Sequence, residues 1–324
     1  MQAAICTRFG PPDVIALDDV PTPEPGPGEV LVRVRAAGVN FADLVVIAGT
    51  YQMKVAPPFV PGMEVAGEVV RAAPDVTGWT AGDRVVALVD AGGYAEYAVV
   101  RADRLVRVPD AMDLTTAAGV FINYGTAHAA LHWRARLQPG ETCLVLGGAG
   151  GVGLAMIATA SRMGSKVIGA ASSAERCAIM ASQGAAETID YGSTKLRDRV
   201  QELTGKRGAD VIIDPVGGEM GGLALRCIGW NGRIVSLGFP AGDPPSYPAN
   251  ILLVKNAAAF GMFFGSYFDR ASDQVRDALA DALAALADGH LRTYPIEARP
   301  LDALPQLLAR MQARQATGKS VVTL

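Results

Sequence analysis

The chain has 324 residues, half of them apolar, which is enough for two hydrophobic cores and predicts two domains. Its formal net charge is −3 at pH 7, with no long run of either sign, which argues against a surface that binds nucleic acid or an anionic membrane. Four scattered cysteines form no C-x-x-C pair, which argues against disulfides and a cysteine metal cage. We see no secretory leader and no apolar run of membrane-spanning length, so we expect a cytoplasmic protein.

The first 110 residues show the pattern of short β-strands. Residues 29–39, EVLVRVRAAGV, mix branched apolar side chains with Arg33 and Arg35, as a half-buried strand does. Further strands are predicted over 64–73, 82–90 and 92–109. Glycine, proline and aspartate separate these stretches, which predicts a compact barrel or sandwich.

The pattern changes after residue 111. Residues 113–136 predict helices, and from about 142 to 238 strands and helices alternate. Such alternation predicts a doubly wound parallel sheet with helices on both faces. Further on, an amphipathic helix is predicted over 273–289, with Asp273 near its start and Gly289 at its end. The final GKSVVTL predicts a strand that rejoins the first domain.

A glycine loop in the alternating region indicates a dinucleotide site. The stretch LVLGGAGGVG contains G-x-G-x-x-G between a predicted strand and a predicted helix. We expect Gly148 to permit the tight turn, Gly150 to let a pyrophosphate approach the backbone, and Gly153 to let the helix pack on the strand. The predicted loop contacts are Gly148, Ala149, Gly150, Gly151, Val152 and Gly153.

The next strand indicates which dinucleotide binds. An NAD site usually has an acidic residue about 20 positions after the loop, whereas this strand ends in Ser172 and Ser173, with Arg176 just beyond. A missing acid beside a cation favours the 2′-phosphate of NADP(H). A purely structural alternative has Ser172 capping the next helix with Glu175 as its capping-box partner. Two more residues, Lys166 and Tyr191, are candidates for the adenosine end.

Several motifs together resemble one enzyme family. The chain contains AAGVNFADLVVIAGTY, PPFVPGMEVAGEV, GYAEYAVV, YGTAHAAL, GGAGGVG and ATGKSVVTL. Over nearly its whole length it resembles the medium-chain dehydrogenase/reductase superfamily, and within it the zinc-free NADPH:quinone oxidoreductase (zeta-crystallin-like) family. This resemblance implies a β-rich GroES-like catalytic domain over 1–120, completed by 261–324, and a Rossmann dinucleotide-binding domain over 121–260.

The resemblance also implies that no catalytic metal is present. Zinc alcohol dehydrogenases of this superfamily have a cysteine ligand where this chain has Asn40 and a histidine ligand where it has Met63. An amide and a thioether do not replace thiolate and imidazole as zinc ligands. For Glu64, we expect a structural role as an acceptor of backbone N–H groups. The pair His128 and His132 lacks a third ligand, so surface imidazoles are favoured over a metal site.

A zinc-free site needs an acceptor that is easy to reduce, and a quinone fits. By resemblance, the catalytic candidates are Asn40, whose amide would orient the acceptor oxygen, and Tyr51, a proton donor. Tyr124 and Thr126 would lie beside the nicotinamide, with Thr126 counted among the catalytic residues. Structural alternatives are a turn role for Asn40 and a rim position for Tyr51.

The remaining cofactor candidates lie near predicted strand ends. Gly238 and Phe239 follow one strand, where parallel sheets bind ligands. By resemblance, Phe263 would lie near the carboxamide and Lys319 near the phosphates, with a solvated turn lysine as the alternative. Asp214 is expected to cap a loop rather than act as an acid.

We therefore predict hydride transfer from NADPH to a quinone. Reduction of activated alkenes, such as 2-enals or enoyl-thioesters, is the alternative, and a non-enzymatic NADPH-binding protein is a third possibility. Relatives of this kind often pair edge strands across a two-fold axis. Residues 233–239 and 250–264 are candidates for that contact, so we expect a homodimer.

Overall fold

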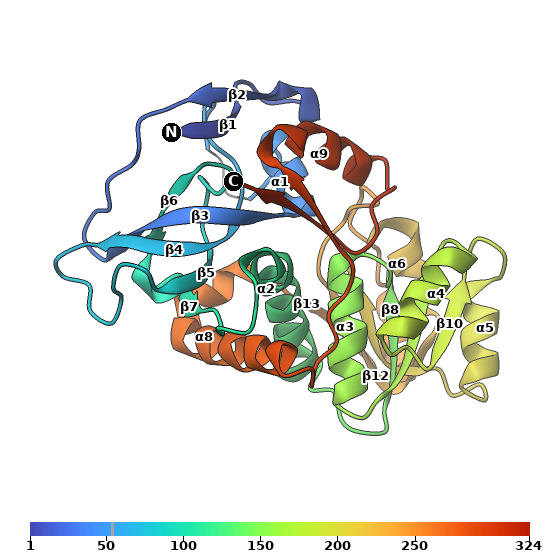
Figure 1. Ribbon diagram of the computed structural model, residues 1–324. Helices are drawn as coiled ribbons and strands as arrows, with labels where there is room; N and C mark the ends of the chain where they lie inside the picture. Colours follow the sequence, from blue (N-terminus) through green and yellow to red (C-terminus); the bar gives the residue numbers. More distant parts are fainter. Residues whose placement is uncertain (53–54) are drawn as a thin grey trace. The chain divides into compact units, whose positions relative to one another are not determined.

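A computed structural model of the chain describes residues 1–52 and 55–324. It divides into two compact units (Figure 1). Unit 1 comprises Met1–Ile122, Gly265–His290 and Pro295–Leu324, and unit 2 comprises Asn123–Phe264 and Leu291–Tyr294. The first boundary falls inside helix α2 (Leu114–His128). None of the described helices is long and apolar enough to cross a membrane.

Unit 1 is built on a mainly antiparallel sheet in the order β14-β15-β3-β4-β5-β7, with β6 paired to β3. Its strands are β3 (Glu29–Val39), β4 (Glu64–Ala72), β5 (Arg84–Leu88), β6 (Tyr97–Arg101), β7 (Leu105–Arg107), β14 (Ile296–Pro300) and β15 (Lys319–Thr323), while β1 (Gln2–Cys6) and β2 (Ile15–Asp19) form a separate pair. Strand β15 pairs antiparallel with β3. This pairing confirms that the last strand rejoins the first part of the chain.

The predicted strand over 92–109 is wrong as one element. The chain forms β6, a 3₁₀ turn η2 (Ala102–Arg104) and then β7. The turn redirects the backbone, so β6 pairs with β3 while β7 pairs with β5. Sequence alternation continues through the turn, which is why the pattern alone did not reveal the break.

The helices of unit 1 are α1 (Phe41–Ile47), the start of α2, α8 (Gly265–Ala287) and α9 (Leu304–Gln312), with the short turns η1 (Pro12–Val14) and η4 (Leu301–Ala303). Helix α8 begins at Gly265, whereas the sequence predicts its start near Asp273. The extra turn precedes a non-helical residue, Ala271. Phe268 in that turn is buried and stacks on Phe121 with ring centroids 6.2 Å apart, so tertiary packing stabilises it.

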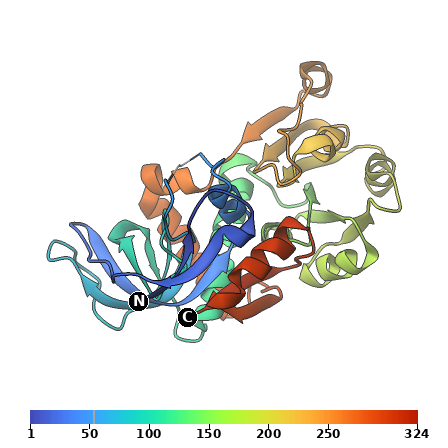
Figure 2. The same ribbon diagram turned by 90° about the horizontal axis from the view of Figure 1, so that it is seen from above.

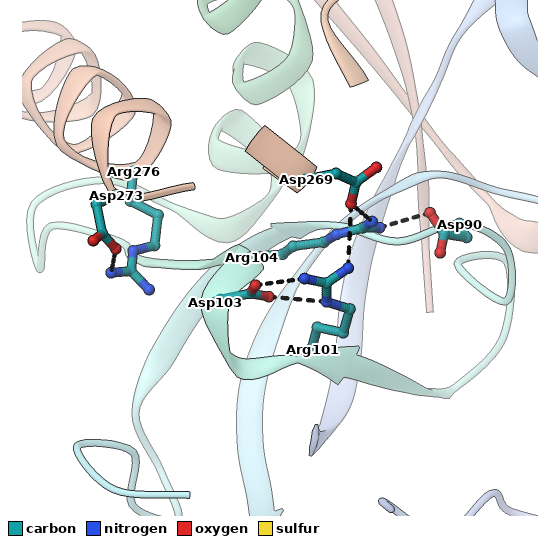
Figure 3. Close-up of polar contacts among 7 residues, drawn as sticks. All are labelled: Asp90, Arg101, Asp103, Arg104, Asp269, Asp273 and Arg276. Atoms are coloured by element: carbon teal, nitrogen blue, oxygen red, sulfur yellow. Dashed lines mark hydrogen bonds and ion pairs between the residues drawn. The ribbon is translucent and has the colours of Figure 1, made fainter. Parts of the chain in front are cut away.

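Ion pairs also hold the N-terminal part of α8, at Asp269 (Figure 3). The Arg104 guanidinium on η2 is buried and donates to Asp90 at 2.6 Å and to Asp269 of α8 at 2.8 Å. Arg101 donates to the same Asp269 oxygen at 3.2 Å and pairs with Asp103. Together Arg101 and Arg104 hold the pKa of Asp269 below its usual range. The buried cation on η2 therefore fixes where α8 starts.

Unit 2 is a doubly wound parallel sheet, as the sequence predicts. Its strands lie in the order β10-β9-β8-β11-β12-β13, and each pairing is parallel. They are β8 (Thr142–Leu146), β9 (Lys166–Ala171), β10 (Glu187–Asp190), β11 (Ala209–Asp214), β12 (Ile228–Ser236) and β13 (Ala258–Gly261). The strand order reverses between β8 and β11, and in such sheets ligands bind at the carboxyl ends of the strands at this point.

The helices of unit 2 are the end of α2 with the π-helical segment η3 (Ala129–Arg134), α3 (Gly151–Arg162), α4 (Ala174–Gln183), α5 (Leu196–Leu203), α6 (Gly218–Leu225) and α7 (Ala249–Lys255). One cluster of its core joins five strands with α5 and α6 through side chains such as Leu144, Ile168 and Ile212. Viewed from above, α7 lies at the outer end of the edge strand β13 (Figure 2).

Asp269→Asn should lower the free energy of unfolding by about 1–2 kcal/mol, because it removes one of two carboxylates that neutralise the buried Arg104. Asp273→Asn is the matched control on the same helix, since it breaks only the exposed pair with Arg276 and should change stability by less than about 0.5 kcal/mol. Urea denaturation measures both. Equal effects would contradict the role given to Arg104.

Candidate functional site

Five polar side chains form a buried cluster in unit 1. Asn40 lies between β3 and α1, Asp43 is on α1, Glu64 opens β4, Tyr94 precedes β6, and Lys319 opens β15. Each is less than a tenth exposed. Buried polar groups are stable only when they are paired, so the contacts within this polar cluster decide what it can do.

The Lys319 ammonium is the centre of the polar cluster. It donates to Glu64 Oε2 at 2.7 Å and to Asn40 Oδ1 at 2.6 Å. The other Glu64 oxygen accepts the backbone N–H of Ile122 at 2.7 Å, which confirms the expected structural role. The solvated-turn alternative for Lys319 is wrong, because the residue is 4% exposed. Its contacts here are with protein oxygens, so the expected contact with cofactor phosphates has no support from them.

The Asn40 amide has no free donor. Nδ2 donates to Glu64 Oε2 at 3.0 Å and to Gly38 O at 3.2 Å, and an amide nitrogen has only two hydrogens. These contacts give Asn40 a structural role and do not support the expectation that its amide orients an acceptor oxygen, which stays a prediction. Its backbone N–H also donates to Asp43 Oδ2 at 2.7 Å, at the start of α1.

Gly38 allows Glu64 to reach this position. It lies opposite Glu64 in the β3–β4 register. A Cβ on Gly38 would lie 2.2 Å from Glu64 Oε2 and 2.4 Å from the carbonyl oxygen of Ala118. No side chain fits there, so the glycine in the AAGVN motif has a packing role that the sequence alone did not reveal.

Asp43 is the member of the polar cluster whose carboxylate is only partly hydrogen-bonded. Oδ2 accepts from the Tyr94 hydroxyl at 2.6 Å, while Oδ1 is buried without a hydrogen-bond partner among the described residues. Burial raises the pKa of Asp43 to about 6, although hydrogen bonds from Tyr94 and Asn40 and the charge of Lys319 act in the opposite direction. Sequence analysis missed Asp43 and Tyr94. The only available signal was an acid three residues after a helix-capping position.

Tyr51 lies close to this carboxylate. It follows α1 and is half-buried. Burial raises the pKa of its hydroxyl, and the charges of Asp43 and Asp90 raise it further. Like an ordinary tyrosine, Tyr51 carries its proton at neutral pH, as a proton donor must. Its part in catalysis stays a prediction.

The polar cluster does not fit a zinc ion. Asn40 Oδ1 and Glu64 Oε2 already contact an ammonium group, and Met63 presents a buried thioether. Zinc sites in proteins use thiolate, imidazole and unpaired carboxylate. In unit 2, the rings of His128 and His132 stack with centroids 4.3 Å apart. Over residues 1–52 and 55–324, no three His, Cys, Asp or Glu side chains lie where they could hold a metal ion.

The glycine loop of unit 2 connects β8 to α3. The residue with positive φ is Gly147, at 56°, so the expected turn role of Gly148 is wrong. A Cβ on Gly148 would instead lie 2.4 Å from Met180 Sδ. A Cβ on Gly153 would lie 2.5 Å from Gly147 O, as expected for close helix packing. At Gly150 the nearest atom, Gly147 O, is 3.6 Å away, so the protein itself leaves that position open.

Four predicted cofactor residues gather at the carboxyl ends of β9 and β10. They are Ser172, Ser173, Arg176 and Tyr191, and the Tyr191 N–H donates to Ala171 O at 2.9 Å. The capping residue of α4 is Ser173, which accepts from the Arg176 N–H at 3.4 Å. The expected Ser172–Glu175 capping box is therefore wrong.

Lys166 is excluded from this group. It opens β9, and the six residues to Ser172 span about 20 Å of extended strand.

Other predicted residues follow β12 and β13. Gly238 and Phe239 come after β12, and Phe263 comes after β13; both phenylalanines are partly exposed. Asp214 Oδ1 accepts the N–H groups of Val216 and Gly217 at 2.9 and 2.8 Å. This confirms its expected role as a loop cap.

Tyr124 differs from expectation. It is 2% exposed, its ring stacks on Tyr294 at 5.6 Å, and its hydroxyl donates to the carbonyl oxygen of Arg292. These contacts give it a packing role, and contact with the nicotinamide has no support from them. Thr126 is buried on α2, and its catalytic part stays a prediction.

Two family models match the chain: the alcohol dehydrogenase GroES-like domain over residues 26–110 and the zinc-binding dehydrogenase over residues 151–284. A quinone oxidoreductase-like protein 2 homolog of Nematostella vectensis is 40% identical to this chain. The match covers 99% of this chain and 88% of the homolog. A Pseudomonas syringae quinone oxidoreductase structure is 31% identical with a TM-score of 0.94, and an Escherichia coli quinone oxidoreductase complexed with NADPH is 26% identical with a TM-score of 0.94. Both cover 100% of both chains.

Gly150→Ala should leave the fold intact but weaken NADPH binding by about tenfold or more, because its Cβ makes only an ordinary contact within the protein, 3.6 Å from Gly147 O, and would lie against a bound pyrophosphate. Gly153→Ala is the comparison: it should lower the melting temperature, since its Cβ overlaps Gly147 and Gly148. Fluorescence titration and thermal melting separate the two. Unchanged NADPH affinity in the folded Gly150→Ala variant would contradict binding at this loop.

Proposed function

Because the chain belongs to the quinone oxidoreductase-like proteins of the medium-chain dehydrogenase/reductase superfamily, we propose that it reduces a quinone with NADPH and without zinc. The observation that carries the proposal is the buried Lys319–Glu64–Asn40 contact, which occupies Asn40, the position where the resemblance implies a cysteine ligand in zinc-dependent relatives. Unit 1 would then be the catalytic domain and unit 2 the dinucleotide-binding domain.

NADP(H) fits the residues of unit 2. The first N–H groups of α3 have no partner within the helix and, with the open side of Gly150, suit a pyrophosphate. Ser172, Ser173 and Arg176 at the end of β9 suit a 2′-phosphate better than a free ribose hydroxyl, since no acidic residue follows that strand directly. When bound, the nicotinamide supplies a hydride. Solved relatives from Escherichia coli and a mycobacterium are described as complexed with NADPH.

The acceptor then needs a proton, and we propose Tyr51 as the donor. A tyrosine hydroxyl is protonated at neutral pH, and burial and two nearby carboxylates raise the pKa of Tyr51 further. Asn40 and Lys319 would have a structural role, since their hydrogen-bond donors are used within the polar cluster. A quinone suits such a site because its reduced form is a weak base and needs little electrostatic stabilisation.

Reduction of an activated alkene is the second candidate. A solved 2-haloacrylate reductase is 28% identical to this chain, with a TM-score of 0.87 and 100% coverage of the chain. An alkene acceptor takes its proton on carbon, which demands more from a general acid. Tyr51 therefore matters more under this alternative than under quinone reduction.

Rates of NADPH oxidation with a quinone panel, 2-haloacrylate and crotonyl-CoA test the proposal. We expect quinones to have the highest kcat/KM, and chelators to leave the rate unchanged. Tyr51→Phe should lower kcat for an alkene by about 10²-fold and for a quinone by less, with Tyr97→Phe as the control in the same unit. A higher kcat/KM for the alkenes would overturn the quinone assignment, and NADPH binding without any turnover would favour a non-enzymatic role.

A homodimer is proposed through the edge of unit 2. Strand β13 ends the sheet, and the adjacent helix α7 exposes Leu253 and Val254 by 77% and 67%. Large exposed apolar side chains beside an unpaired strand edge suit a second copy of the chain. The cytoplasmic location and the absence of nucleic-acid or membrane partners stay predictions from composition.

Light scattering should give twice the 33.6 kDa mass of the chain. Leu253→Asp should shift the protein to monomer, because a carboxylate would be buried in the contact. Leu17→Asp, at an exposed leucine of unit 1, should leave the dimer unchanged. A monomeric wild type would contradict the proposal.

A further inference from the structure

We propose, on the premise of the proposed zinc-free reduction, that Lys319 is a positioning residue. Its ammonium group takes the place of a bound metal as the cation that organises the polar cluster of unit 1. The family model described as a zinc-binding dehydrogenase matches residues 151–284, and in the polar cluster of unit 1 the buried cation is supplied by the chain itself. Lys319 touches neither cofactor nor acceptor in this proposal and acts through its neighbours.

The ion pair is unusual for its burial. The Lys319 and Glu64 side chains are 3% and 0% exposed, whereas the pair Arg35–Glu68, also involving β4, is 40% exposed on both sides. Each buried charge is tolerated because the other is present, and removing one partner leaves the other without compensation. Glu64 is therefore held in one place by Lys319 and by the N–H of Ile122.

Lys319 also decides which way the Asn40 amide points. With Oδ1 facing the ammonium, Nδ2 can donate to Glu64 and to Gly38 O. The flipped amide would place its NH₂ against the ammonium and its oxygen against two acceptors. Only one orientation satisfies every group, and the cation selects it.

This arrangement is linked to the expected proton donor. The Asn40 N–H donates to Asp43, which also faces the Tyr94 hydroxyl, Glu64, Lys319 and Tyr51. The charge of Lys319 lowers the pKa of Asp43, and the charge of Asp43 raises the pKa of Tyr51. Loss of the ammonium must therefore move the ionisation of Asp43 to higher pH, which a purely space-filling role of Lys319 does not predict.

The competing role is direct contact with the cofactor phosphates, expected from the resemblance. The two roles differ in kinetics. A phosphate contact binds NADPH, so its loss raises KM for NADPH. A positioning cation affects the arrangement at the reacting centre, so its loss lowers kcat with KM for NADPH nearly unchanged.

The test is a double-mutant cycle of Lys319→Met and Glu64→Gln. The control is Glu68→Gln on the same strand, β4, which breaks the exposed ion pair with Arg35. We expect Lys319→Met to lower both the melting temperature and kcat, the latter by about tenfold or more, with KM for NADPH within about twofold. The double variant should recover much of the lost melting temperature, because no uncompensated carboxylate remains, while its kcat should stay low, because no cation orients the Asn40 amide. Glu68→Gln should behave as wild type.

Two further measurements test the positioning role of Lys319. In Lys319→Met, the pH transition of kcat that belongs to Asp43, identified by its absence in Asp43→Asn, should move to higher pH. Lys319→Arg, which keeps a cation, should retain more activity than Lys319→Met. A raised KM for NADPH with unchanged kcat, an unmoved pH transition, or a double variant no more stable than Lys319→Met would each overturn the proposal.

The cycle can also be measured by thermal melting, with no activity required. A protein that reduces no acceptor would therefore end the proposed function, while thermal melting would still show whether Lys319 and Glu64 are coupled. A cycle without coupling in an active enzyme would end only the role of Lys319. If Lys319→Met does not fold, the stability of the double variant tests the ion pair. A double variant that also fails to fold would show that the uncompensated Glu64 is not the cause of the defect.

Discussion

One buried ion pair organises unit 1. Lys319 and Glu64 are 255 residues apart in the chain and 2.7 Å apart in space. A pair of buried charges seldom adds much net stability, but it fixes geometry because neither partner tolerates the loss of the other. The pair ties the last strand, β15, to β4, and Asn40 and Gly38 bring β3 into the same contact.

The same pair explains how a fold shared with zinc-dependent enzymes can do without zinc. A metal centre needs free anionic or neutral donors around an open position. Here those donors are already satisfied by an internal ammonium, so the protein keeps a fixed positive charge but no Lewis acid. Under the proposed function, chemistry at such a site would depend on side-chain donors such as Tyr51 and would favour acceptors that are easy to reduce.

Unit 2 contributes through topology more than through any single side chain. Its strand order reverses between β8 and β11, which brings the glycine loop and the ends of β9, β12 and β13 to one edge of the sheet. Residues far apart in sequence, such as Arg176 and Phe263, thereby share that edge. The loop glycines have different roles. Gly147 adopts the positive φ of the turn, Gly153 allows the helix to pack closely on the loop, and Gly150 leaves room for a ligand.

The sequence by itself determined the parallel sheet, the glycine loop, the return of the last strand and the loss of zinc ligands, because periodicity, glycine spacing and residue type are local properties. Tertiary structure alone decided the partner of Lys319, the occupied amide of Asn40, the buried Asp43–Tyr94 contact and the packing role of Tyr124. These depend on burial and on contacts between distant segments, and a side chain's chemistry follows from its neighbours in space. Lys319 shows this most clearly, since the same residue type in a solvated turn would be an ordinary surface charge.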